Sequence, residues 1–188
     1  ILNTQKATLS QIQKNAEIMT MIDAFGLSVD PKTMKLTYRP EDLRYGKIII
    51  ESDADVDGAH IKNLFYTFIW TFCPQLIEDG YVYAGVPPLY RITENKDTYV
   101  YLKDDAELEE YRKKHPGKKL ALTRMKGLGE MDEIETKILV DPAQRIINRV
   151  TVEDAKVADR LFDDLMGDAV VPRKKFIKDH SDEAKYHI

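Results

Sequence analysis

The sequence predicts an α/β fold, and three observations lead to it. Residues 47–52 form a short run with three isoleucines, which has the length and composition of a buried strand. Aspartates and Gly58 follow directly, and the segment after them carries apolar residues at helical spacing. The apolar run 81–86 predicts a further strand. In open α/β sheets, ligands bind beyond the carboxyl ends of the strands, so residues 53–58 are the first candidate site.

Composition limits the class of protein. The chain has 188 residues, 43% of them hydrophobic and 32% charged, which suits one globular domain with or without a smaller appendage. Cys73 has no partner for a disulfide within the chain, which favours a reducing, cytoplasmic setting. The longest apolar stretch, 61–73, is too short to cross a bilayer, so we expect no membrane partner. The chain begins with Ile1 rather than Met, so we expect a fragment or a processed piece.

The net charge of −4 argues mildly against nucleic-acid binding, but the total hides local clusters of cations. These lie at 112–114, 118–119 and 173–178. Affinity for phosphates depends on the local field, so each cluster is either part of a basic face or ordinary solvated surface.

Cap residues predict two helices at the start of the chain. Thr8 with Gln11 forms a capping box, and Asn15 caps a second helix that Gly26 ends. The polar stretch 27–43, with two prolines, is predicted to be a loop.

The middle of the chain alternates between helix and strand. Pro74 ends the apolar helix that follows Gly58, and the two prolines 87–88 end the strand 81–86. Alternation over 89–93 and 98–102 predicts a hairpin.

Further elements are predicted towards the end of the chain. Residues 104–115 are helix-prone, and 120–123 are a strand candidate. Thr151, with Asp154 three residues later, caps a helix that ends before Gly167. The tail from Pro172 is basic, and no element is predicted for it.

The candidate chemistry lies in Asp53, Asp55 and Asp57. Carboxylates this close repel one another unless something neutralises them, and Mg²⁺, which prefers oxygen ligands, is the simplest candidate. Alternating aspartates at a strand end suit two-metal phosphodiester chemistry.

Other interpretations of the acidic loop remain open. A non-catalytic Ca²⁺-binding module needs a glutamate at loop position twelve, where this chain has Leu64. A phosphatase-like aspartyl nucleophile needs a further acidic pair, for which 163–164 are available. The plainest alternative is an acidic surface turn in which Asp57 caps the helix.

The stretch 126–131, Lys-Gly-Leu-Gly-Glu-Met, is interpreted as a backbone device. Its two glycines allow a tight turn, from which Lys126 could approach a phosphate or a carboxylate. A purely structural turn that closes the domain is the alternative.

These residues resemble a known family. Asp53-Ala54-Asp55-Val56-Asp57-Gly58 is similar to the Asp-x-Asp motif of the Toprim domain in the B subunits of bacterial type IIA topoisomerases, DNA gyrase and topoisomerase IV. Stretches at 1–7, 43–45, 87–90, 126–131 and 165–168 resemble the same family in the same order. Residues 134–137 depart from the family's usual Leu-Trp-Glu-Thr segment, which indicates a divergent member. These motifs do not separate gyrase from topoisomerase IV.

The resemblance implies a fold and a metal site. It implies a Toprim domain over residues 1–103, with its N-terminal part missing, in which a Rossmann-like parallel sheet is flanked by helices. A smaller α+β C-terminal extension would cover 104–188. Asp53 would bridge two Mg²⁺ positions, Asp55 would hold the second, and Asp57 would support them, so all three are the expected catalytic residues. The family's first metal ligand, a glutamate, lies upstream of Ile1, so we expect an incomplete site.

The resemblance also implies binding residues and partners. Asn3, His60 and Arg173 lie where the family contacts DNA, and we add Lys62 and Lys126 as candidate phosphate contacts. Glu17 falls where the family lines a quinolone-type inhibitor pocket. The expected partners are double-stranded DNA and an A subunit that supplies the nucleophilic tyrosine in an A2B2 heterotetramer.

ATP would bind only to an N-terminal domain absent from this chain, and the chain alone should cleave nothing. The alternatives are another Toprim nuclease or primase, or the Ca²⁺-binding module.

Overall fold

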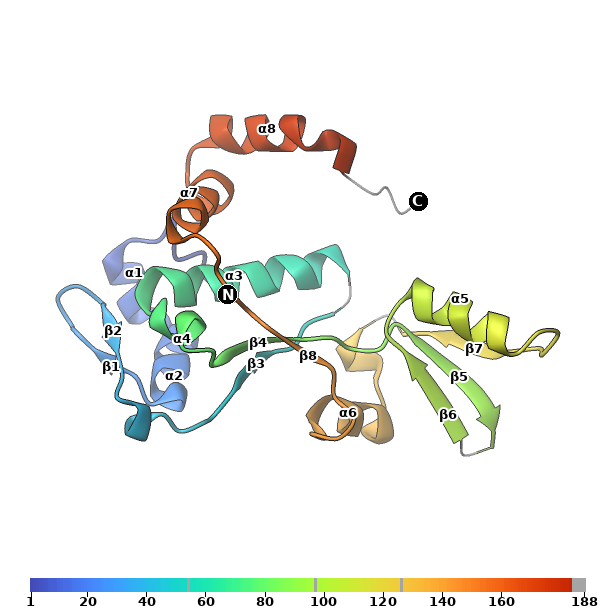
Figure 1. Ribbon diagram of the computed structural model, residues 1–188. Coiled ribbons are helices and arrows are strands. Elements are labelled where there is room, and N and C mark those ends of the chain that lie inside the picture. Colours follow the sequence, from blue (N-terminus) through green and yellow to red (C-terminus); the bar gives the residue numbers. More distant parts are fainter. Residues whose placement is uncertain (54, 97, 126, 184–188) are drawn as a thin grey trace. The chain divides into compact units, whose positions relative to one another are not determined.

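The computed structural model describes residues 1–53, 55–96, 98–125 and 127–183 (Figure 1). The chain divides into two compact units. The first comprises Ile1–Ile48, Asn63–Tyr81 and Val150–Ile188, and the second comprises Ile49–Lys62 and Val82–Arg149.

The first unit is mainly helical. Its elements are α1 (Leu9–Lys14), α2 (Ala16–Phe25), β1 (Ser28–Val29), β2 (Leu36–Thr37), the 3-10 turn Pro40–Asp42, the later part of α3 (Val56–Phe72), α4 (Gln75–Glu78), α7 (Ala155–Met166), α8 (Val170–Asp179) and the 3-10 turn Ser181–Glu183. The capping box at Thr8 and the N-cap at Asn15 are confirmed. Gly26 ends α2 with a left-handed φ of 80°, a conformation that glycine adopts without steric cost.

The core of the first unit lies around α3. Phe68 and Ile69 of α3 and Ile18 of α2 are almost fully buried. Trp70 stacks on Phe162 of α7 with 6.0 Å between ring centroids. Helix α3 is therefore buried on most of its later turns, as its apolar sequence predicts.

The second unit contains two three-stranded sheets. The first sheet has the order β3 (Ile48–Ile50), β4 (Val82–Gly85), β8 (Ile147–Arg149), and β4 pairs with β8 antiparallel. The second has the order β6 (Thr98–Leu102), β5 (Tyr90–Asn95), β7 (Ala121–Arg124), with both pairings antiparallel. The remaining elements are α5 (Asp105–Lys114), the 3-10 turn Leu128–Glu130 and α6 (Glu133–Val140).

Helix α5 covers the β6-β5-β7 sheet, as Figure 1 shows. Its buried Leu108 packs with Tyr90, Ile92 and Leu102 of the hairpin β5–β6. The predicted hairpin and its helix therefore share one small hydrophobic cluster.

The mixed α/β class is confirmed, and several details differ from the prediction. Asp154, not Thr151, caps α7, because its side chain accepts hydrogen bonds from the backbone of Lys156 and Val157. The segment 27–43 contains β1 and β2, which at two residues each are too short to give a pattern.

Helices α6 and α8 were not predicted. The proline that opens the basic tail lies in the first turn of α8, where its missing N–H is tolerated. The resemblance implied a parallel sheet, whereas strand β8 pairs with β4 in the antiparallel direction. The domain boundary between 103 and 104 stays a prediction.

Candidate functional site

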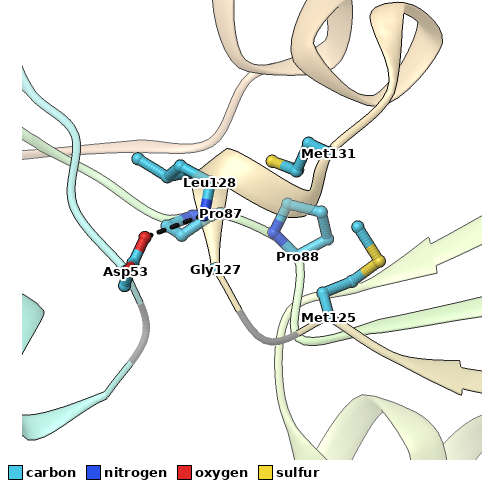
Figure 2. A pocket seen from close by; sticks show the side chains of 7 residues that line it. All are labelled: Asp53, Pro87, Pro88, Met125, Gly127, Leu128 and Met131. Carbon is cyan, nitrogen blue, oxygen red and sulfur yellow. Dashed lines mark hydrogen bonds between the residues drawn. The ribbon is translucent and has the colours of Figure 1, made fainter.

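Asp53 follows the buried strand β3, and a turn distant in sequence fixes its carboxylate. Asp53 Oδ1 accepts a hydrogen bond of 2.8 Å from the backbone N–H of Leu128, which Figure 2 marks with a dashed line. Leu128 opens the 3-10 turn Leu128–Glu130, so this N–H has no partner within a regular helix. Gly127 and Leu128 of this stretch therefore hold a carboxylate through the main chain.

Gly127 allows this close approach. A Cβ built on Gly127 would lie 3.1 Å from Asp53 Oδ2 and 3.3 Å from its Cγ. The same residues line a recess of about 10 Å³, together with Pro87, Pro88, Met125 and Met131 (Figure 2). This recess has room for a single water molecule at most.

Asp55 caps helix α3. Its Oδ1 accepts a 2.8 Å hydrogen bond from the backbone N–H of Gly58, and its carbonyl accepts one of 3.0 Å from Ala59. A Cβ on Gly58 would lie 2.1 Å from the carbonyl oxygen of Asp53, so the turn from strand to helix closes only around glycine. The alternative interpretation, in which Asp57 caps the helix, is wrong, because the capping residue is Asp55.

Asp57 and His60 lie on the exposed side of the first turns of α3. Asp57 places a negative charge near the positive end of the helix dipole. Lys62, one turn later, is partly buried, and its Nζ donates a 3.0 Å hydrogen bond to the carbonyl of Gly85 on β4. Lys62 thus fixes the early part of α3 to the sheet.

The oxygens of Asp53 and Asp55 fit a hard cation. A carboxylate offers about four acceptor positions, and each of these two uses one for a backbone N–H. Mg²⁺ is usually bound by only one or two carboxylates together with waters. Within the described parts of the chain, no group of three or more His, Cys, Asp or Glu residues is placed to hold a metal ion. These two carboxylates could therefore supply part of a Mg²⁺ site.

Two of the predicted DNA contacts lie in the first unit and bind the end of α7. Asn3 Nδ2 donates to the carbonyl of Met166 at 2.9 Å. Arg173 Nε donates to the carbonyl of Leu165 at 2.8 Å, and its Nη2 donates to that of Gly167 at 2.5 Å. Both side chains thus satisfy carbonyls that a helix end leaves without partners.

Glu17 and Lys126 are the remaining predicted site residues. Glu17 lies in the first turn of α2 with its side chain 67% exposed. Lys126 lies outside the described residues. The structure thus brings Asp53, Asp55, Asp57, His60 and Lys62 onto one strand–loop–helix segment.

Sequence reasoning missed two features of the second unit. It did not foresee that the N–H of Leu128 binds Asp53, because main-chain donors carry no sequence signal. It also missed the ion pair between Arg91 on β5 and the buried Glu135 on α6. The capping box of Asp132 with Glu135 was a local signal for α6, but nothing local indicates its cationic partner.

Known proteins are similar to this chain over nearly its whole length. The family model described as the carboxyl terminus of the DNA gyrase B subunit matches residues 117–178. The DNA gyrase B subunit of Mycoplasma pneumoniae is 45% identical over 187 residues, which is 98% of this chain and 28% of that protein. The gyrase B protein of Thermus thermophilus is 42% identical over 100% of this chain and 30% of its own length. The chain belongs to the DNA gyrase B family.

The gyrase B relatives also extend over the acidic loop, which the family model does not reach. The gyrase B protein of Haloferax volcanii is 43% identical over 99% of this chain and 28% of its own length. This chain therefore spans less than a third of each gyrase B relative named here. In the part of the chain that the structure describes, no helix is long and apolar enough to cross a membrane.

Proposed function

We propose that this chain is part of the Mg²⁺-dependent DNA cleavage and religation module of an ATP-dependent type IIA topoisomerase. The observation that carries the proposal is the anchoring of Asp53 and Asp55. Each carboxylate is fixed by one backbone N–H and keeps acceptor positions for a cation. The similarity to gyrase B proteins over nearly the whole chain supports the same assignment.

The proposal includes the Toprim fold for the region around the acidic loop. Asp53 and Asp55 would hold Mg²⁺, and Asp57 would support them. When bound, Mg²⁺ would supply stabilisation of the negative charge that develops on the phosphate and the leaving oxygen.

This chain's own residues would orient the site. The Leu128 N–H fixes the direction of the Asp53 carboxylate, and the Asp55 cap fixes the start of α3. His60 lies on the exposed side of the first turns of α3, where a DNA backbone would contact it. Lys62 would contact a phosphate with the donors that its bond to the Gly85 carbonyl leaves free. Asn3 and Arg173 would contact DNA with the donor capacity that their bonds to α7 leave free.

The partners are part of the proposal. The nucleophilic tyrosine would come from the A subunit of a cytoplasmic A2B2 complex acting on double-stranded DNA. ATP would bind elsewhere in the complete gyrase B protein, and Glu17 would line a quinolone-type inhibitor pocket in the cleavage complex.

The test compares two variants of the complete gyrase B protein, Asp53→Asn and Asp55→Asn, in complex with the A subunit. Both substitutions keep the size and the hydrogen-bond acceptor but remove the charge that a divalent cation needs. We expect DNA cleavage in Mg²⁺ to fall by at least about 100-fold, the order of effect when a group that stabilises the transition state is removed. Asp182→Asn, on the exposed turn Ser181–Glu183, is the matched control and should cleave normally.

Undiminished cleavage by both variants would disprove the assignment. Tight Ca²⁺ binding that orders the chain, without any effect of either substitution on cleavage, would favour the Ca²⁺-binding module instead. Cleavage by the chain without any A subunit would favour the Toprim nuclease.

A further inference from the structure

Strand β7 forms an edge of its sheet in the second unit. It comes last in the order β6–β5–β7, and among the residues that the structure describes no strand pairs with its other side. All four of its residues are exposed, and one of them is the apolar Leu122, which is 38% exposed. The edge of a sheet offers unpaired main-chain N–H and C=O groups, to which another extended chain can bind.

The register of β7 shows which of its main-chain groups face away from β5. The N–H of Met125, directly after β7, donates a 2.9 Å hydrogen bond to the carbonyl of Leu89, directly before β5. This bond continues the antiparallel register of the two strands. Main-chain groups alternate in direction along an extended strand, so those of Thr123 also face β5. Those of Leu122 and Arg124 therefore face away from β5 and can pair with an added strand.

A recess of about 400 Å³ lies at β7 on the side of the sheet that carries α5. Leu122 reaches this side because it lies opposite Ile92, which packs against Leu108 of α5. The lining combines two leucines with basic side chains: Arg112, His115, Gly117, Lys118, Leu120 and Leu122. An apolar side chain of an added strand can therefore contact the leucines while acidic ones face the cations.

Cations lie at both ends of β7. Lys119 precedes the strand by two residues and Arg124 is its last residue, and neither forms an ion pair with any residue that the structure describes. Asp132 and Glu135 line a recess together with Arg124, but both pair with Arg91. The two ends of the strand thus favour negative charge on whatever binds along it.

The cations of the recess are already paired, but only at the surface. Arg112 pairs with Glu109 at 2.6 Å and Lys118 pairs with Glu94 at 2.9 Å, and both cations are exposed. Exposed ion pairs contribute little to stability, so a carboxylate of a ligand can join them at low cost.

The same charges disfavour a second copy of this chain as the occupant. Edge-to-edge pairing of two β7 strands would place the cations of both copies, Lys119 and Arg124, along one short ladder. Like charges on neighbouring strands are destabilising. An acidic strand meets no such repulsion.

We propose that the free edge of β7 binds an extended acidic segment of a partner protein, which adds a fourth strand to the β6–β5–β7 sheet. Its main chain pairs with Leu122 and Arg124, an apolar side chain contacts Leu122, and acidic side chains face Lys119 and Arg124. Main-chain hydrogen bonds would provide affinity and the side chains specificity, as in other cases of strand addition. This binding is independent of any part that the chain plays in DNA cleavage.

The test is an NMR titration of the isotope-labelled full chain with the end-capped peptide Glu-Thr-Val-Thr-Glu-Thr. Backbone signals of Leu122, Thr123 and Arg124 should shift, whereas those of Tyr99 and Tyr101, on the opposite edge strand β6, should not. We expect a dissociation constant of about 1 mM, since a few main-chain hydrogen bonds give weak affinity. The peptide Lys-Thr-Val-Thr-Lys-Thr should bind about 5- to 10-fold more weakly.

Two substitutions of one residue test the main-chain contact. Leu122→Ala and Leu122→Pro both remove the leucine side chain, but only proline also removes the N–H that faces away from β5. Proline is tolerated at such a position of an edge strand. Leu122→Pro should therefore bind the acidic peptide about 3- to 10-fold more weakly than Leu122→Ala.

A charge substitution tests the specificity. Lys119→Gln should reduce the preference for the glutamate peptide over the lysine peptide by about 2- to 5-fold. Lys113→Gln, on the exposed surface of α5 and outside the recess, is the matched control and should leave the preference unchanged. This comparison still decides if Leu122→Pro does not fold.

Four results would overturn the proposal. The first is the absence of shifts in β7, and the second is equal binding of the two peptides. The third is a change of the β7 signals on dilution without peptide, which would assign the edge to a second copy of the chain. The fourth is tighter binding of a DNA duplex of about 12 base pairs than of the acidic peptide at the same signals, which would assign it to nucleic acid.

Discussion

Two glycines define the geometry of Asp53. Gly127 approaches its carboxylate from the turn after β7, and Gly58 packs against its carbonyl from the first turn of α3. Neither glycine has the positive φ that would require glycine by itself, so the available space, not backbone strain, requires it.

Gly127→Ala tests the contact with the carboxylate. The added methyl group would lie 3.1 Å from Asp53 Oδ2, so the carboxylate or the turn must shift by a few tenths of an ångström, which would disturb the Leu128 hydrogen bond. Since small misplacements of catalytic groups cost on the order of 100-fold in rate, we expect Mg²⁺-dependent cleavage by the reconstituted enzyme to fall by about 10- to 100-fold. Gly129→Ala, where a Cβ meets nothing within 4 Å, is the control. Equal cleavage by the two variants would show that Gly127 does not position Asp53.

Gly58→Ala tests the turn between strand and helix. Alanine in a helix normally stabilises by about 1 kcal/mol relative to glycine. Here its Cβ would lie 2.1 Å from the carbonyl oxygen of Asp53, so we expect the free energy of unfolding to fall by roughly 1 to 3 kcal/mol. Urea denaturation measures this, with Gly46→Ala, in open space, as the control. A stabilised Gly58→Ala variant would contradict the described turn.

At the scale of elements, one buried ion pair joins α6 to the β5–β6 hairpin. Glu135 of α6 pairs with Arg91 of β5 and also accepts a hydrogen bond from the backbone of Asp132 in the capping box. Removing one partner leaves the other charge buried and alone. We expect Arg91→Met to destabilise the chain by about 3 to 5 kcal/mol in urea denaturation.

The double variant Arg91→Met/Glu135→Leu removes both charges and should be more stable than either single variant. Additive losses in this double-mutant cycle would show that the two residues do not interact.

Cys73, directly after α3, has a buried thiol. Burial raises its pKa to about 11, above the value of about 8.5 for an exposed cysteine. The folded state therefore retains the proton over a range in which the unfolded state loses it. Stability from this group is constant below about pH 8.5 and falls as the pH rises towards 11.

Two measurements check the burial of the Cys73 thiol and its effect on stability. A thiol reagent at about pH 8 should react slowly with the folded chain and quickly in urea. Between about pH 8 and pH 10, the original chain should lose more stability than Cys73→Ala, a comparison that isolates this group from other titrations. Rapid labelling of the folded chain would contradict the burial of Cys73.

At the scale of the whole molecule, the expected active site is divided between polypeptides. If the nucleophilic tyrosine belongs to the A subunit, this chain with Mg²⁺ and plasmid DNA should give no cleaved product above background. Gel electrophoresis after protease treatment measures this. The complete gyrase B protein with the A subunit is the positive control, and cleavage by the chain alone would mean that it holds its own nucleophile.

Local patterns predicted much of the fold. The capping box at Thr8, the cap at Asn15, the strand before Asp53 and the hairpin β5–β6 all depend on residues close in sequence. Elements that need distant partners were missed or wrongly bounded. The two-residue strands β1 and β2 have too little pattern, and α8 lies in the basic tail, for which no element was predicted.

The sequence by itself determined where the acidic loop lies and which residue types it offers, since a strand, three alternating aspartates and a helix are all local features. The tertiary structure decided what each aspartate does. Asp53 is held by Leu128, 75 positions away in the chain, and Asp55 rather than Asp57 caps α3. Only the fold could decide this, because the hydrogen bond to Asp53 comes from a backbone N–H, which every residue except proline has and no sequence pattern marks.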